Sequence, residues 1–94
     1  MLQDFKRSLD NSSPPKDLTP ALLALWHDGR GDWGAAHRVA QDVEDETAAW
    51  VHAYLHGTEG DEANAGYWYR RARRPHSRLS LEAEWEEIAA TLCE

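Results

Sequence analysis

The stretch HGTEGDEANAGYWYRRA, residues 56–72, decides the fold because its plan occurs twice in the chain. When the sequence is laid over itself with an offset of 29 positions, Gly31 falls on Gly60 and Asp32 falls on Asp61. A Gly-Asp pair between alanine-rich segments is typical of a turn between two helices, with Asp capping the second. The offset therefore predicts two helix-turn-helix units, as in a helical repeat array. The other identities are Ala24 with Ala53, His27 with His56 and Ala36 with Ala65.

Capping residues and apolar spacing predict an all-α chain. Thr19 followed by Pro20 is typical of a helix start, and Gly29 of a helix end. No segment alternates apolar and polar residues over a useful length, so no β-sheet is expected. The length of 94 residues indicates one domain, residues 1–94. Its expected parts are residues 1–19, a short N-terminal helix and a Pro/Ser-rich linker; residues 20–43, unit 1; residues 45–74, unit 2; and residues 80–92, a C-terminal capping helix.

The helix expected after Asp45 differs from the others because it is apolar around most of its circumference. Its apolar residues leave only a narrow polar strip, formed by His52 and His56. These apolar residues include Trp50, Val51, Tyr54 and Leu55. A helix that is apolar nearly all round packs against neighbours on more than one side. We therefore expect it to be the central helix of the domain.

Charge and cysteine content limit the classes of function. The net charge of −7 argues against a nucleic-acid binder and gives no indication of an anionic membrane surface as partner. Cys93 is the single cysteine, so no intrachain disulfide or cysteine metal cage is expected. No segment is long and apolar enough for a signal peptide or a bilayer span, which makes a cytoplasmic location the expectation. No catalytic or cofactor-binding motif is found, so neither catalytic residues nor a cofactor are predicted.

The run NAGYWYRRA, residues 64–72, resembles the second helix of a Sel1-type repeat, a relative of the tetratricopeptide repeat. In that helix a small residue, a Trp-Tyr pair and a basic residue followed by Ala occur in this order, as Ala65, Trp68-Tyr69 and Arg71-Ala72 do here. The first unit matches less well, with Val39 in place of the Trp, and the 29-residue period is shorter than these families use. The longer run WVHAYLHGTEGDEANAGYWYRRA also resembles a group of short bacterial proteins with no established activity. These resemblances imply a helical repeat fold and no particular chemistry.

The leading hypothesis is a small module that binds a protein or peptide partner, whose identity the sequence does not give. Residues of the first helix of each unit are expected to line a groove, among them His52 and His56. The margin of this groove is expected to hold Asn64, Tyr67 and Arg71. Tyr and Arg are enriched at binding hot spots. A homodimer is an alternative, because a two-unit array leaves apolar faces at its ends. The capping helix is expected to cover one end, and the N-terminal helix the other end or a second chain.

The second hypothesis is a small enzyme or a metal- or ligand-binding protein that uses a cluster of histidines and acids. His52 and His56 lie four residues apart on one helix face, and two imidazoles so placed can bind one zinc ion. Glu59, Asp61 or His27 would supply further ligands. The Glu that follows the first His in zinc proteases is absent. The residues of this cluster are His37, His52, His56, Glu59 and Asp61.

The histidines and arginines in these hypotheses also have simpler structural interpretations. His27 and His56 fall in the last turn of a helix, where imidazole can meet free carbonyls and the negative end of the helix dipole. His52 can face solvent, and His37 can form a polar contact between the units. The arginine-rich run RRARRPHSR, residues 70–78, can bind an anion, or be neutralised by the acidic capping helix that follows it.

Overall fold

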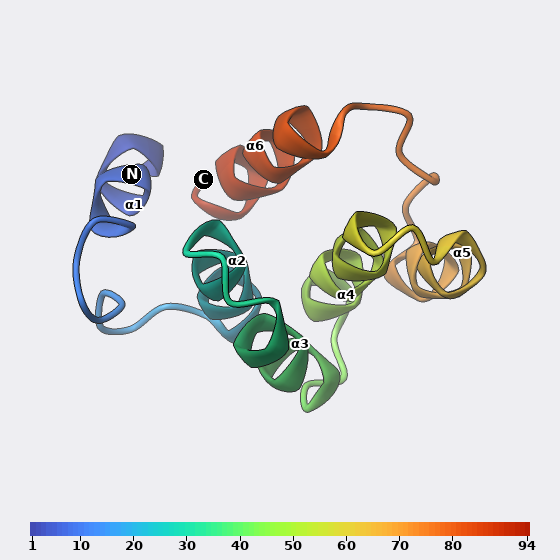
Figure 1. The fold of residues 1–94 in the computed structure, drawn as a ribbon, viewed down its shortest axis with the longest axis horizontal. Helices are drawn as coiled ribbons and strands as arrows, with labels where there is room; N and C mark the ends of the chain where they lie inside the picture. The colour runs from blue at the N-terminus through green and yellow to red at the C-terminus, as the bar shows by residue number, and fades with distance from the viewer.

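The computed structural model describes residues 1–94, which form six α-helices and no strand (Figure 1). The predicted all-α class is thus confirmed. No helix has both the length and the apolarity needed to cross a membrane. The helices are α1 (Leu2–Ser8), α2 (Pro20–Gly29), α3 (Trp33–Gln41), α4 (Glu46–Thr58), α5 (Glu62–Ala72) and α6 (Leu81–Leu92).

Side-chain caps start the five helices from α2 to α6. In each, a hydroxyl or carboxylate oxygen of the N-cap residue accepts a hydrogen bond from a backbone N–H in the first turn, as in the 2.7 Å bond from Ala48 N to Asp45 Oδ1. Such a cap satisfies a donor that the helix itself leaves without an acceptor. The predicted helix starts are therefore confirmed. The N-cap residues are Thr19, Asp32, Asp45, Asp61 and Ser80.

The two Gly-Asp turns have the same geometry. Gly31 and Gly60 both lie in the left-handed region, with φ of 83° and 78°. In each turn, the N–H of the following Asp donates to the carbonyl of the His five residues earlier, at 2.9 Å for Asp32 and 3.0 Å for Asp61. This is the Schellman end of a helix, in which a residue without a Cβ adopts positive φ at least cost. The prediction that the two pairs lie in equivalent turns is confirmed.

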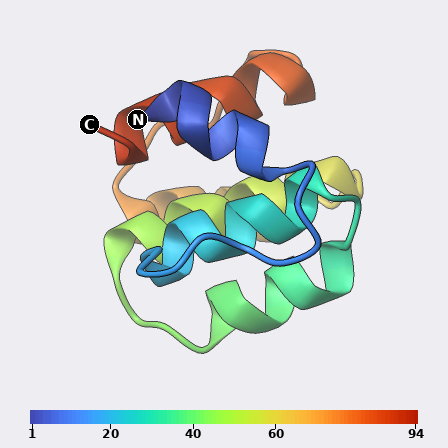
Figure 2. The same cartoon turned by 90° about the vertical axis from the view of Figure 1, so that its left-hand side faces the viewer.

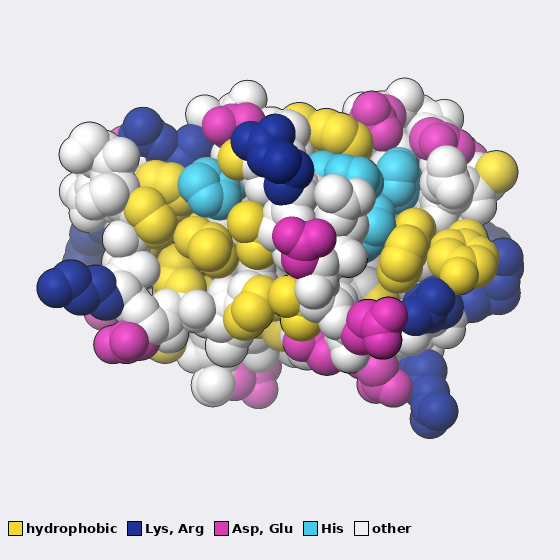
Figure 3. Space-filling model, turned by 90° about the horizontal axis from the view of Figure 1, so that it is seen from below, with side chains coloured by type: hydrophobic (Ala, Val, Ile, Leu, Met, Phe, Trp, Pro, Cys, Tyr) yellow, Lys and Arg dark blue, Asp and Glu magenta, His cyan; other side chains and the backbone are white.

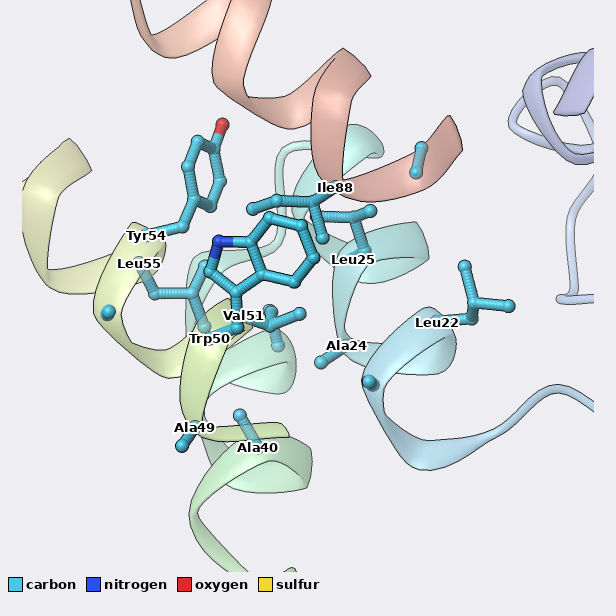
Figure 4. Close-up of a cluster of buried hydrophobic side chains, with 14 of the residues drawn as sticks. Leu22, Ala24, Leu25, Ala40, Ala49, Trp50, Val51, Tyr54, Leu55 and Ile88 are labelled. Carbon is cyan, nitrogen blue, oxygen red and sulfur yellow. The ribbon is translucent and has the colours of Figure 1, made fainter. Parts of the chain in front are cut away.

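Helix α4 lies at the centre of the molecule, with α2, α3, α5 and α6 packed against it (Figure 1). Every residue from 48 to 55 is buried. Figure 4 shows Trp50 and Val51 of α4 close to Leu25 of α2 and Ile88 of α6. The predicted central helix is confirmed, and its side chains form the middle of the core.

The N-terminal helix packs beside the C-terminal helix, and both ends of the chain lie close together (Figure 2). The rings of Phe5 and Trp85 stack with centroids 5.9 Å apart, and Lys6 Nζ lies 2.9 Å from Glu86 Oε1. Helix α1 therefore contacts both α2, which begins the first predicted unit, and the capping helix α6. The irregular residues 9–19 lead from α1 to the start of α2, and Trp26 Nε1 anchors the end of α1 by donating to the Ser8 carbonyl at 3.2 Å.

We predict that Ile88→Ala lowers the free energy of unfolding by about 2–5 kcal/mol, because it opens a cavity where α6 meets α4. Ile88 is fully buried, with 0% exposure. Urea unfolding followed by circular dichroism measures the change. Leu81→Ala is the matched control on the same helix, because Leu81 is 44% exposed, and it should change stability by no more than about 0.5 kcal/mol. Equal losses in the two variants would contradict the described packing of α6.

Candidate histidine site

Three histidines from two helices meet beside the core. His37 comes from α3, and His52 and His56 come from successive turns of one face of α4. One ring nitrogen of each lies within 4.8 Å of the corresponding nitrogens of the other two. Figure 3 shows histidine side chains gathered on one face of the molecule, where part of their surface reaches solvent. The packing of α3 against α4 thus joins residues that the sequence separates.

Tryptophan rings stack on two of the three imidazoles, those of His37 and His52. The Trp33 ring stacks on His37 with centroids 4.8 Å apart and planes 10° apart, and its Nε1 donates to the Leu55 carbonyl at 2.9 Å. The Trp68 ring stacks on His52 with centroids 3.9 Å apart and planes 17° apart. This stacking orients the rings of His37 and His52 towards their neighbours.

The nitrogens within the cluster have an incomplete set of hydrogen bonds. His52 Nε2 and His37 Nε2 lie 3.0 Å apart, so the N–H of one donates a hydrogen bond to the other. This contact is the polar link between units that the sequence offered as the simpler role of His37. The Nδ1 atoms of His52 and His56 are buried and have no hydrogen-bond partner. Buried polar nitrogens normally have a partner, so two such atoms in one cluster are unusual.

Burial and neighbouring imidazoles favour the neutral form of His52 and His37. Burial, together with the proximity of His37 and His56, lowers the pKa of His52 to about 4. Burial and the neighbouring His56 also lower the pKa of His37. Neutral imidazole is the form that binds metal ions. At neutral pH His37 and His52 therefore present unprotonated nitrogens.

The two acids of the predicted cluster have different positions. Glu59 Oε1 lies 3.4 Å from His56 Nδ1, beside the cluster. Asp61 caps α5, and its Oδ2 accepts a 2.8 Å hydrogen bond from Asn64 Nδ2. These hydrogen bonds from Asn64 lower the pKa of the Asp61 carboxyl. Neither acid, nor His27, belongs to the group whose ligand atoms converge.

The predicted partner-binding residues divide between α4, which carries His52 and His56, and α5, which carries Asn64, Tyr67 and Arg71. His52 is only 3% exposed, so its ring has almost no surface to offer a partner. Asn64 is exposed but bonded to Asp61. Tyr67 is 43% exposed, and its Oη accepts a 2.9 Å hydrogen bond from Arg71 Nη1. Asn64, Tyr67 and Arg71, all on α5, thus form the exposed part of the predicted set.

A shallow groove adjoins this exposed pair. It has a volume of about 300 Å³, and its walls include Trp68 and Arg71 of α5 and residues 43–46, which join α3 to α4. The guanidinium of Arg71 lies 5.2 Å from the Trp68 ring centroid. One face of the Trp68 ring stacks on His52, so the same residue contributes to the histidine cluster and to the groove.

The arginine-rich run is not neutralised by the acidic helix that follows it. None of the ion pairs joins residues 70–78 to α6. Arg73 Nε instead lies 3.2 Å from Glu46 Oε2, and the Arg74 guanidinium lies 3.7 Å from the Trp50 ring centroid. The expected charge compensation by α6 is therefore wrong, and α4 provides the contacts of these two arginines.

Sequence reasoning did not identify the two tryptophans as part of this site. By sequence spacing alone, Trp33 falls on one apolar helix face with Ala36 and Ala40, and Trp68 falls on another with Ala65 and Ala72, which predicts core packing for both rings. Both rings do pack against the core, and both also stack on histidines. The available signal was the four-residue spacing of Trp33 and His37, which puts both rings on one helix face.

Comparison with family models, with curated proteins and with solved structures finds no match to this chain.

We predict that the metal-free protein loses stability as the pH falls from about 6.5 towards 4. The unfolded chain protonates His52 near its ordinary pKa of 6.5, whereas the folded protein resists protonation until about 4, so acid favours the unfolded state. His52→Phe keeps an aromatic ring beside Trp68 and removes this titration. The difference in free energy of unfolding between the two proteins, measured with urea at several pH values, should decrease on acidification. A difference that is constant with pH would contradict the burial of a neutral His52.

Proposed function

We propose that this protein binds one divalent first-row transition-metal ion, such as zinc, through His37, His52 and His56. The observation that carries the proposal is the convergence of three imidazole nitrogens within 4.8 Å of one another. Imidazole is a common ligand of zinc, copper, nickel and iron in proteins. This is the metal-binding form of the second hypothesis from the sequence.

The spacing of the nitrogens fits a single ion. Zinc–nitrogen bonds of about 2.0–2.1 Å place two ligand atoms of a tetrahedral ion about 3.3 Å apart. His52 Nε2 and His37 Nε2 are 3.0 Å apart, and no pair in the cluster exceeds 4.8 Å. Small side-chain rotations bring all three to bonding distance. A bound ion would also replace the direct contact between His37 and His52, so that both lone pairs face the metal.

The surroundings of the cluster favour binding over a purely structural contact. Stacking on Trp33 and Trp68 fixes ring orientations in advance, which reduces the entropy lost when a ligand set is assembled. The Nδ1 atom of His52 is buried without a hydrogen-bond partner, and that of His56 has only Glu59 Oε1 at 3.4 Å, so the hydrogen bonds within the protein do not satisfy the cluster by themselves. A structural polar contact has no need of a third histidine.

The experiment compares zinc affinity of the wild type with that of histidine variants. Metal-free protein should bind one zinc per chain in calorimetry, and zinc at 100 times Kd should raise Tm by about 10 °C or more. His37→Asn and His56→Asn should each weaken zinc binding by at least about 10–100-fold, the range known for loss of an outer-shell partner. Circular dichroism verifies that both variants fold.

His27→Asn is the matched control, because His27 occupies the last turn of α2 as His56 occupies the last turn of α4. It lies outside the converging group, so its loss should leave zinc affinity unchanged. Absence of zinc binding, or equal weakening by His27→Asn, would overturn the proposed function.

A second candidate function is the binding of a protein or peptide by a helical repeat module of the Sel1 or tetratricopeptide type. The matched Schellman turns at Gly31 and Gly60 support two related units. The exposed pair Tyr67 and Arg71 beside the groove supports a docking surface, because Arg71 has no ion-pair partner. A surface Arg without an acid partner is available to an acidic group of another molecule. In this proposal the docking surface is centred on Tyr67 and Arg71.

The test for this second function is a pull-down with wild type, Tyr67→Ala and Arg71→Ala as baits. Both variants should lose a partner that the wild type retains, because hot-spot truncation costs about 2 kcal/mol or more. Arg70→Ala, one residue earlier and also exposed, is the control and should retain the partner. If no partner is recovered, or if both variants keep every partner, this surface is not a docking site.

A further inference from the structure

The histidine site has three protein ligands where a tetrahedral ion has four positions. We propose that the fourth position is exchangeable and takes water or a small anion, such as a carboxylate. This inference rests on the proposed metal binding and goes one step further. It assigns the ion the role of a Lewis acid that binds an external ligand, instead of a purely structural link between α3 and α4.

The number of converging side chains leaves one position for an external ligand. No carboxylate or thiolate has its ligand atom within the converging group. Asp61 is bonded to Asn64 as the cap of α5. Glu59 lies 3.4 Å from His56 Nδ1, which is the position of an outer carboxylate that orients a ligating histidine. Structural zinc sites have four protein ligands, and sites with three keep an open position.

The charge of the site favours an anion in that position. A divalent ion with three neutral imidazoles keeps both of its positive charges, because no ligand is a thiolate or carboxylate. Arg71 adds a further positive charge nearby, since its guanidinium lies 5.2 Å from the Trp68 ring that stacks on His52. Glu59 is the acid beside the cluster, and its side chain is 45% exposed, which reduces its neutralising effect.

The location of the cluster allows a small ligand to reach it. His37 and His56 are half-buried, whereas His52 is buried. Figure 3 shows histidine side chains at the molecular surface on this face. Trp33 and Trp68 stack on the rings of His37 and His52. The partial exposure of His37 and His56 would give a small ligand a route to an ion held between the three nitrogens.

Cobalt(II) in place of zinc gives a direct test, because its visible absorption reports changes of coordination. Metal-free protein is loaded with one equivalent of cobalt(II) and titrated with thiocyanate at constant ionic strength. The inference predicts a saturable change in the visible spectrum, from replacement of water by the anion. A cobalt-loaded protein whose spectrum does not respond to thiocyanate would overturn the inference and leave the proposed metal binding intact.

Glu59→Gln identifies the cause of a negative result. If the wild type is silent and Glu59→Gln responds to thiocyanate, Glu59 is the fourth ligand and the inference is wrong. If both proteins respond, the carboxylate lies outside the coordination sphere, as the inference requires. Absence of cobalt binding to the wild type is a separate outcome, which overturns the proposed function together with this inference.

Discussion

The burial of α4 on every side is the constraint on which the rest of this structure depends. Trp50, Val51 and Leu55 need apolar neighbours in several directions, and α2, α3, α5 and α6 supply them. The polar strip of the same helix is thereby covered too, which leaves His52 only 3% exposed. A buried imidazole needs a polar partner, and His37 of α3 provides one at 3.0 Å. The packing that forms the core thus also forms the histidine cluster.

Directional bonds from tryptophans fix how the helices around α4 are placed. In a chain this short the core is thin, and large rings provide much of its buried area. Three of the indoles also donate to a backbone carbonyl of another helix: Trp26 at 3.2 Å, Trp33 at 2.9 Å and Trp85 at 3.2 Å. Tyr69 of α5 likewise donates to the carboxylate of Glu84 in α6, and burial raises the pKa of both groups. Apolar packing alone would allow these helices to shift along one another, whereas the hydrogen bonds between them fix one relative position.

The sequence predicts what is local and leaves open what depends on helix packing. Caps such as Asp32 and Asp45 act within one turn, so the helix starts could be read directly. The helix against which α1 packs could not be predicted, because the apolar face of an amphipathic helix does not specify which neighbour it covers. The histidine cluster could be predicted in part. Spacing joins His52 to His56, but the approach of His37 depends on how α3 crosses α4, and the exclusion of Asp61 depends on its role as a cap.

The 29-residue offset explains why the histidine cluster occurs once in the chain. His56 has a counterpart in His27, at the same position in an equivalent turn. His52 corresponds to Leu23, however, and His37 corresponds to Gly66. The cluster therefore lies at the junction where the second helix of the first hairpin meets the first helix of the next one. The two hairpins share the Gly-Asp turn, and residues that differ between them, His37 and His52, complete the histidine cluster at this junction.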